Sequence, residues 1–185
     1  MSPVKVRDLL ERKGDPLQLE ALTGDIGLDR EMPTAEVSSP GLVLAGYTKR
    51  FASTRIHVLG QTEITYLASL DPEARRRSLE TFFTFDLPCV VVTKGQEAPA
   101  ELLELARAKG VAVIRSKLKT SEFFRRMMAF LDETFAPATT LHGSLADVFG
   151  VGLLFIGRSG IGKSECVLDL VERGHRLVAD DLVHI

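Results

Sequence analysis

The sequence predicts an α/β protein: an N-terminal α/β domain with a mostly parallel sheet, then the beginning of a P-loop nucleotide-binding α/β domain. Two observations carry this prediction. Short apolar runs alternate with amphipathic helical segments through most of the chain, which is typical of a parallel sheet covered by helices. Near the end, the glycine-rich stretch "GRSGIGKS" at 157–164 follows an apolar run and precedes a helical pattern.

Composition narrows the class of protein. Of 185 residues, 45% are hydrophobic and 26% charged, as in ordinary globular proteins. A net charge of −2 gives no basic field for nucleic acid, and no apolar run is long enough to cross a bilayer. The charged start "MSPVKVRDLLERKGD" lacks a signal-peptide core, so we expect a cytoplasmic protein with no membrane partner. Cys89 and Cys166 are expected to be unpaired and buried.

The first elements follow from periodicity and from turn residues. "VKVRDLLERKG" (4–14) predicts a helix that ends at Gly14. "LVLAGY" (42–47) and "TRIHVLG" (54–60) are interpreted as strands, each with a glycine at or near its end. Asp71-Pro72 then opens a helix, with aspartate as the N-cap and proline at the first helical position.

A strand–helix alternation follows. "LPCVVVT" (87–93) is nearly all apolar and predicts a strand buried on both faces. "APAELLELARAKG" (98–110) predicts a helix closed by Gly110, and "VAVIRS" (111–116) a second buried strand. The stretch 121–135 predicts another helix, whose apolar face would contain Phe124, Met127, Met128 and Leu131.

"FAPATTL" (135–141) breaks this rhythm and is interpreted as a linker. It would separate an N-terminal domain, residues 1–134, from the start of the nucleotide domain, residues 142–185. Within the second part, "SLADVFG" and "VGLLFIG" predict a hairpin whose second strand is buried and leads into the glycine-rich loop.

The loop fits G-x-x-x-x-G-K-[ST]. Glycines let consecutive main-chain N–H groups turn inward toward phosphate oxygens, and the helix that follows adds the positive end of its dipole. Lys163 would reach the β and γ phosphates, and the Ser164 hydroxyl would bind Mg²⁺. The predicted phosphate-binding residues are Gly157, Arg158, Ser159, Gly160, Ile161, Gly162, Lys163 and Ser164.

The next predicted strand, "HRLVADD", ends in Asp180 and Asp181. One carboxylate there could hold Mg²⁺, and its neighbour could accept a proton from an attacking hydroxyl. Adjacent residues on a strand point to opposite faces, so both could address one site only if the strand twists or ends there. The pattern alone leaves motor ATPase, GTPase, small-molecule kinase and protein kinase open, and leaves His142 as a turn residue or a catalytic one.

The ordered set "LHGSLADVFGVGLLFIGRSGIGKSECVLDLVERGHRLVADD" closely resembles the bacterial HPr kinase/phosphorylase family. The stretches "SPGLVLAGY", "TRIHVLGQTE" and "LPCVVVTKG" resemble landmarks of the family's N-terminal part, so the resemblance covers most of the chain. It implies an N-terminal domain similar in fold to the N-terminal domain of cell-wall ligases.

The resemblance implies a bifunctional enzyme of carbon catabolite regulation. Such enzymes phosphorylate a serine of HPr, the phosphocarrier protein of the sugar phosphotransferase system, with ATP or pyrophosphate. They reverse the modification by phosphorolysis, in which inorganic phosphate releases pyrophosphate. Carried over by motif, His142 and Lys163 are catalytic, Ser164 binds Mg²⁺, and the pair Asp180–Asp181 contains the base, with Asp181 favoured.

The family also implies a homohexamer that binds HPr. Two departures stand out: Arg158 occupies a position that is usually acidic, and family members continue for more than a hundred residues past the aspartates. The sequence is therefore interpreted as a C-terminally truncated form, whose own activity stays open. The alternatives are a non-catalytic nucleotide-sensing or interaction module and a small-molecule P-loop kinase.

Overall fold

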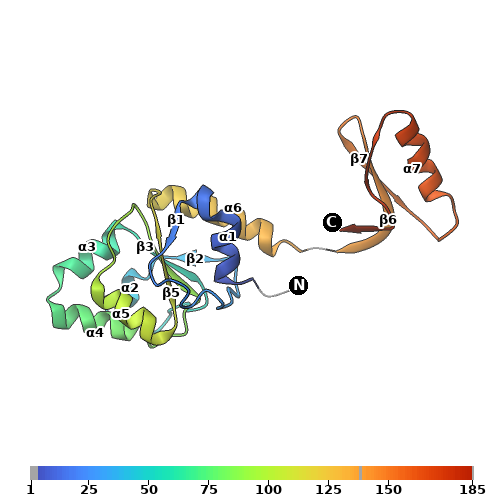
Figure 1. Ribbon diagram of the computed structural model, residues 1–185. Helices are drawn as coiled ribbons and strands as arrows, with labels where there is room; N and C mark the ends of the chain where they lie inside the picture. The colour runs from blue at the N-terminus through green and yellow to red at the C-terminus, as the bar shows by residue number, and fades with distance from the viewer. Residues whose placement is uncertain (1–3, 138, 185) are drawn as a thin grey trace. The chain divides into compact units, whose positions relative to one another are not determined.

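The computed structural model describes residues 4–137 and 139–184. It divides into two compact units, Met1–Phe135 and Ala136–Ile185 (Figure 1). The predicted linker 135–141 spans this division, and its residue Ala138 lies outside the described residues. Within the described part of the chain, no helix has both the length and the hydropathy needed to cross a bilayer.

A five-stranded sheet forms the centre of the N-terminal unit, in the order β1-β5-β4-β3-β2. The four strands β2 to β5 are parallel, and β1 pairs antiparallel with β5, so the predicted mostly parallel sheet is confirmed. The strands are β1 (Leu19–Ala21), β2 (Val37–Ser38), β3 (Ile56–Leu59), β4 (Cys89–Val92) and β5 (Ala112–Ser116).

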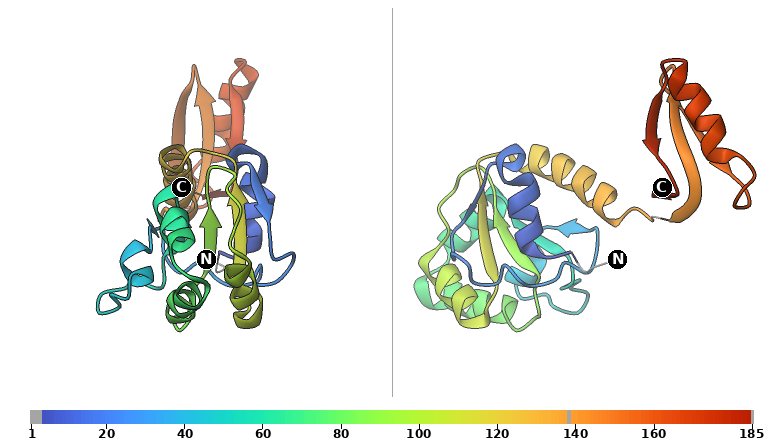
Figure 2. Two further views of the ribbon diagram at one scale, coloured as in Figure 1. Left: turned by 90° about the vertical axis from the view of Figure 1, so that its left-hand side faces the viewer. Right: turned by 45° about the vertical axis from the view of Figure 1, so that its right-hand side comes forward.

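Helices cover both faces of this sheet (Figures 1 and 2). Helices α2 to α5 lie on one face and α1 and α6 on the other, because each group shares its own buried apolar cluster with the sheet. The helices are α1 (Val6–Leu17), α2 (Gly41–Leu44), α3 (Gln61–Ser69), α4 (Pro72–Phe82), α5 (Ala100–Lys109) and α6 (Thr120–Phe135).

Strand β4 contributes side chains to both apolar clusters, one on each face of the sheet. All four of its residues are fully buried. Cys89 and Val91 join the cluster with α1 and α6, whereas Val90 and Val92 join the cluster with α2 to α5. Because side chains alternate between faces, only an uninterrupted apolar run satisfies both, as the sequence predicts.

The end signals of two helices act as predicted. The Asp71 carboxylate accepts a hydrogen bond from the Ala74 N–H at 2.8 Å, which caps α4. Gly110 closes α5 with a φ of 64°, a left-handed conformation that glycine adopts without strain.

Two predictions at the start of the chain are wrong. Helix α1 does not stop at Gly14 but continues to Leu17, because the fully buried Leu17 packs into the core and outweighs the weak helix propensities of glycine and proline. The segment "LVLAGY" is not a strand: residues Gly41–Leu44 form the short helix α2. Val43 and Leu44 are buried, and buried positions take apolar residues in a short helix as well as in a strand. The apolar run therefore does not distinguish the two conformations.

Two burial predictions also need correction. The buried face of α6 is centred on Phe123, Met127, Phe130 and Leu131, whereas Phe124 is only partly buried and Met128 is 36% exposed. The buried face of α6 is thus rotated from the predicted face toward Phe123 and Phe130. Cys89 is buried as predicted, but Cys166 is exposed, and both thiols are free.

In the C-terminal unit, every strand pairs antiparallel with β6. The predicted hairpin is confirmed: β6 and β7 pair from Gly143 opposite Ile156 to Val148 opposite Val151. Phe149 and Gly150 make the turn with φ of 52° and 82°. The elements are β6 (Thr140–Val148), β7 (Val151–Ile156), α7 (Lys163–Glu172), β8 (Arg176–Ala179) and β9 (Leu182–His184).

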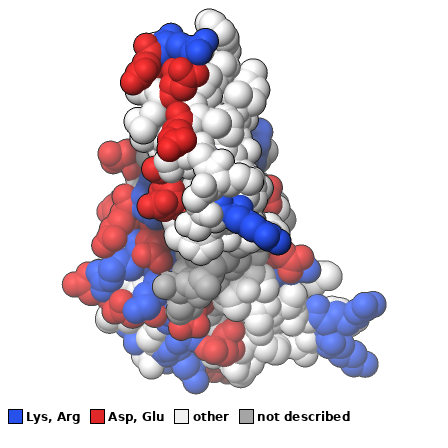
Figure 3. All heavy atoms as spheres, turned by 90° about the vertical axis from the view of Figure 1, so that its right-hand side faces the viewer, with Lys and Arg blue, Asp and Glu red and all other residues white. Residues whose placement is uncertain are grey.

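On the face shown in Figure 3, the C-terminal unit has a broad uncharged area, with acidic side chains along one margin and basic side chains at its edges. Strand β7 is exposed or half-buried along its length, so the prediction that it is buried is wrong for this structure. Many large apolar side chains of this unit are exposed, which is typical of a region that contacts further protein. They are Phe149, Val151, Leu153, Ile156, Ile161, Leu168, Val171, Leu177, Val178 and Leu182.

Candidate functional site

The glycine-rich loop joins the end of β7 to the start of α7. Gly160 and Gly162 have φ of 77° and 96°, and Gly162 is the N-cap of α7. Side chains other than glycine resist these dihedrals. The Ile161 N–H donates to the Arg158 carbonyl at 3.4 Å, which folds the loop back on itself. Strand, loop and helix therefore follow one another as the sequence predicts.

Lys163, the first residue of α7, turns back over the loop. Its ammonium group donates hydrogen bonds to the carbonyl oxygens of Gly157 and Arg158, each at 2.9 Å. These contacts hold a positive charge against the start of the loop. The first N–H groups of α7 have no acceptor inside the helix, so they add to the attraction for an anion.

Asp180 lies at the centre of the second set of contacts. Its Oδ1 accepts a hydrogen bond from the Ser144 hydroxyl at 2.5 Å and another from the Ser164 hydroxyl at 3.5 Å. Ser144 is on β6 and is 1% exposed, whereas Ser164 is in the first turn of α7. The carboxylate thus links the sheet to the helix that begins at the loop.

Asp180 and Asp181 lie between β8 and β9, both of which pair with β6. The strand ends at Ala179, and Asp181 has a φ of 68°, so the two carboxylates are not constrained to opposite faces of a regular strand. The Asp181 carbonyl accepts a hydrogen bond from the Gly143 N–H at 3.2 Å.

His142 is brought to the same place by strand register. It pairs with Leu182, so it lies on β6 beside the residues that follow the two aspartates. Gly143 comes next, and a Cβ atom there would lie 2.6 Å from the Phe155 carbonyl oxygen of β7. Glycine is therefore required for β6 and β7 to approach one another at this point.

The hydroxyl of Ser164 and the carboxylate of Asp180 face each other, and both are oxygen ligands of the kind Mg²⁺ takes. No three His, Cys, Asp or Glu side chains gather as a metal site in the part of the chain that the structure describes. Magnesium at phosphate sites uses one or two carboxylates together with phosphate oxygens, so the pair fits this ion without a larger cluster.

The predicted residues fall into three groups. Ser164 and Asp180 are in direct contact. Asp181 follows Asp180 between β8 and β9, and His142 lies on β6 opposite Leu182, the residue after Asp181. Lys163 contacts the start of the loop. The remaining residues belong to the loop: Gly162 is half-buried, and the others are exposed to solvent, namely Gly157, Arg158, Ser159, Gly160 and Ile161.

Local sequence patterns do not indicate a role for Ser144 or Gly143. Their signal is weak: a small polar residue and a glycine inside a strand pattern usually indicate a bulge or a close backbone approach. The register of β6 against β8 does shift, between Leu145 and Ala146. The partner of Ser144 lies 36 residues along the chain, beyond the reach of local patterns.

The fold and the site define a protein of the P-loop class, in which a strand, a phosphate-binding loop and a helix are joined to a carboxylate that follows another strand of the same sheet. Two sequence families match: one described as HPr Serine kinase N terminus, over residues 4–131, and one described as HPr Serine kinase C-terminal domain, over residues 133–185. The chain belongs to the HPr serine kinase family.

Curated relatives agree with this assignment. Proteins named HPr kinase/phosphorylase from Bacillus cytotoxicus and Bacillus mycoides are 41% and 40% identical over all 185 residues. The chain spans 59% of the length of these relatives. A solved structure of the CBS and DRTGG domains of a Clostridium perfringens pyrophosphatase is 18% identical, with a TM-score of 0.45 over 66% of this chain and 47% of that one.

Proposed function

We propose that this protein is an HPr(Ser) kinase/phosphorylase, which phosphorylates HPr on a serine with ATP or pyrophosphate and removes the phosphoryl group by phosphorolysis. The observation that carries the proposal is the contact of Asp180 with Ser164, because it joins a carboxylate to the first turn after the phosphate loop. The names of the relatives support HPr as the substrate.

In this proposal the loop residues 157–164 bind the phosphates of the nucleotide through main-chain N–H groups. The Lys163 ammonium group, already against the loop, stabilises negative charge that develops on the transferring phosphoryl group. Ser164 and Asp180 would hold Mg²⁺, which supplies further neutralising charge when bound. Ser144 is a positioning residue, since it acts by orienting Asp180.

We assign the base to Asp181. Asp180 is engaged by two hydroxyl groups, whereas the backbone bend at Asp181 turns the chain away from the regular strand. Asp181 would take the proton of the HPr serine hydroxyl as its oxygen attacks the terminal phosphoryl group, and ADP would leave. In phosphorolysis, phosphate would attack the phosphoserine and the proton would return to the serine oxygen. His142, beside the aspartates, would contact the reacting groups.

The test is transfer of label from γ-labelled ATP to HPr in the presence of Mg²⁺, followed by reversal with inorganic phosphate. We expect label on an HPr serine and release of pyrophosphate in the reverse direction. Lys163→Ala should abolish both reactions, whereas Lys109→Ala, at the end of α5 in the other unit, should leave them unchanged.

Two outcomes would contradict the proposal. Transfer to a small metabolite but not to HPr would indicate a small-molecule kinase. Nucleotide binding without any transfer would indicate a sensing or interaction module. As the family resemblance implies, we also propose a homohexamer in the cytoplasm, which light scattering and cell fractionation would test.

A further inference from the structure

The N-terminal unit contains a hollow of about 450 Å³ that the proposed function does not use. Its lining follows the carboxyl ends of all four parallel strands: Ser39 after β2, residues 60–63 after β3, Lys94 after β4 and residues 119–121 after β5. In open parallel sheets, ligands bind outside the carboxyl ends of the strands.

The charge of this hollow is positive on balance. Lys94 and Lys119 are two lysines among the lining residues, against one carboxylate, Glu63. The Glu63 side chain is committed to the fold, since its Oε2 accepts the Gly60 N–H at 2.9 Å and the residue is 8% exposed. Lys94 donates to the Gln61 side chain at 2.6 Å. Lys119 is exposed and has no ion pair with the described residues.

Hydrogen-bond donors converge on the same hollow. Helices α3 and α6, of 9 and 16 residues, both begin there, and their first N–H groups have no acceptor within the helix. The two starts are close, because a Cβ atom on Gly60 would lie 3.2 Å from the Thr120 hydroxyl oxygen. The end of β4 lies beside them, since the Thr93 and Thr120 hydroxyls are 2.8 Å apart. Lining hydroxyl groups add donors that can turn toward an anion; they belong to Ser39, Thr62, Thr120 and Ser121.

We propose that this hollow binds the phosphoryl dianion of a small molecule, with Lys94 and Lys119 as its cationic contacts. Two ammonium groups and several fixed N–H and O–H donors suit a tetrahedral oxyanion with three or more acceptor oxygens. The volume exceeds that of phosphate and is in the range of small-ligand sites, which favours a phosphomonoester with an organic body over the free ion. This site lies in the N-terminal unit and is separate from the loop at 157–164.

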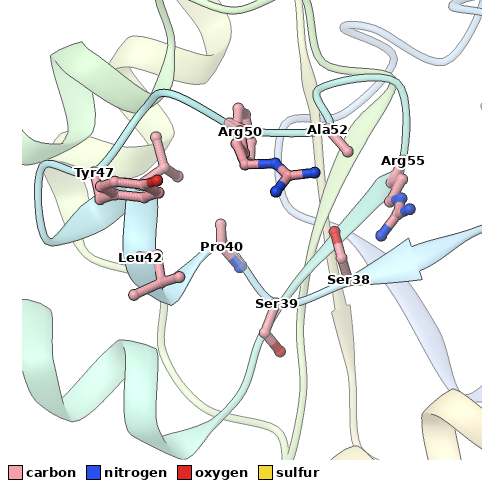
Figure 4. Close-up of a pocket in the computed structure, with 10 residues that line it drawn as sticks. Ser38, Ser39, Pro40, Leu42, Tyr47, Arg50, Ala52 and Arg55 are labelled. Atoms are coloured by element: carbon pink, nitrogen blue, oxygen red, sulfur yellow. The ribbon is translucent and has the colours of Figure 1, made fainter.

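A neighbouring hollow is the main competitor for the same ligand. It has a volume of about 340 Å³ and shares Ser39 with the first. Arg50 and Tyr47 line it, from the loop before β3, as Figure 4 shows. The Arg55 guanidinium at its rim is already paired with Glu36, at 3.0 Å. Arg50 has no ion pair with the described residues, so it supplies a single free cation where the first hollow supplies two lysines.

The test is a titration of the full chain, followed by amide NMR, with inorganic phosphate and separately with glycerol 3-phosphate at constant ionic strength. We expect saturable shifts at the amides of Gln61, Thr62, Thr120 and Ser121. The amides of residues 157–164 report the phosphate loop in the same spectra, so loss of one site is distinguishable from loss of the other. Tighter binding of glycerol 3-phosphate supports a phosphomonoester ligand; tighter binding of phosphate supports the free ion at the same site.

Variants locate the binding. Lys94→Gln and Lys119→Gln should each raise the dissociation constant measured from the shifts of the four amides by about tenfold, as expected for loss of one charge-assisted hydrogen bond. Lys117→Gln is the matched control, because this exposed lysine precedes the same helix but does not line the hollow. Unchanged sheet amides verify the fold. Shifts that do not saturate, or that respond to Arg50→Gln and not to the lysine variants, would overturn the proposal.

Discussion

The carboxylate of Asp180 accepts a hydrogen bond of 2.5 Å from the hydroxyl of Ser144, which links β6 to the segment between β8 and β9. Ser144 is buried on β6, and the second hydroxyl that donates to the carboxylate is that of Ser164 on α7. The two hydrogen bonds restrict the rotation of the Asp180 side chain. A ligand oxygen that is held in this way binds a metal ion without first losing rotational freedom. Ser144 therefore prepares Asp180 for the role that we propose for it.

Replacing Ser144 by alanine should weaken Mg²⁺-dependent binding of ATP. Loss of one hydrogen bond corresponds to about two- to tenfold in affinity. Titration of ATP binding against Mg²⁺ concentration measures the effect. Ser69→Ala serves as the control, since the Ser69 hydroxyl also makes one hydrogen bond, to the Tyr66 carbonyl at 2.7 Å, but lies in α3 of the N-terminal unit. An equal effect of both variants would contradict a specific role of Ser144.

Replacing Gly143 by alanine should destabilise the C-terminal unit. The new Cβ atom would lie 2.6 Å from the Phe155 carbonyl oxygen, and the two strands would have to separate. Overpacking of this kind costs about 1–3 kcal/mol. Urea unfolding followed through the C-terminal amides measures the loss. Gly152→Ala is the matched control on the partner strand, because its Cβ would meet only the Leu145 side chain, at 3.7 Å. Similar losses in both variants would contradict the explanation.

His57 should make the N-terminal unit less stable in mild acid. Burial lowers the pKa of His57 to about 4; the Ser53 carbonyl opposes this shift and the charge of Arg55 adds to it. Between its unfolded pKa of about 6.5 and 4, the unfolded chain binds the proton and the folded chain does not. Stability is therefore complete above the unfolded pKa and falls as the pH falls toward 4, by up to about 3 kcal/mol.

The measurement is the free energy of unfolding from pH 7.5 to pH 4.5 for the unaltered protein and for His57→Gln. We expect the variant to lose less stability over this range, because glutamine does not titrate. The imidazole packs against the rings of Phe51 and Phe82, so the variant will also be less stable at every pH. Parallel curves for the two proteins would show that His57 does not carry the dependence.

The two thiols should differ sharply in reactivity. Cys89 is fully buried, and burial raises its pKa to about 12, so the thiolate is scarce as well as inaccessible. Cys166 is exposed in α7. A colorimetric thiol reagent at neutral pH should therefore modify one thiol in the folded chain and both in denaturant. With Cys166→Ser, the folded chain should not react; rapid reaction of that variant would mean that Cys89 is accessible.

Much of the N-terminal fold is predictable from local patterns. The buried strand at Cys89–Val92 and the helix closed by Gly110 follow from an uninterrupted apolar run and a C-terminal glycine. The segment "LVLAGY" could not be assigned in the same way, because four or five apolar residues suit a helix as well as a strand. The continuation of α1 past Gly14 depends on Leu17 reaching a core that only the tertiary structure creates.

For the candidate site too, local motifs are predictable from the sequence and contacts between distant segments are not. The loop and the aspartate pair are contiguous motifs, so their residues could be identified from spacing. The contact of Asp180 with Ser144, and the need for glycine at position 143, arise from pairing between distant strands. Neither can be read from one segment alone. The residue pattern alone leaves His142 undecided between a turn residue and a catalytic one, and only the resemblance to the family implies a catalytic role for it.

The order of the N-terminal sheet has a consequence for how the chain folds. Strands β2 to β5 each pair with the next along the chain, so this part can assemble progressively during synthesis. Strand β1 differs, because its partner is β5 and Leu19 faces Ser116. The first strand to leave the ribosome must therefore wait for nearly a hundred further residues, and the closing of that edge is a late step with a large loop-closure entropy.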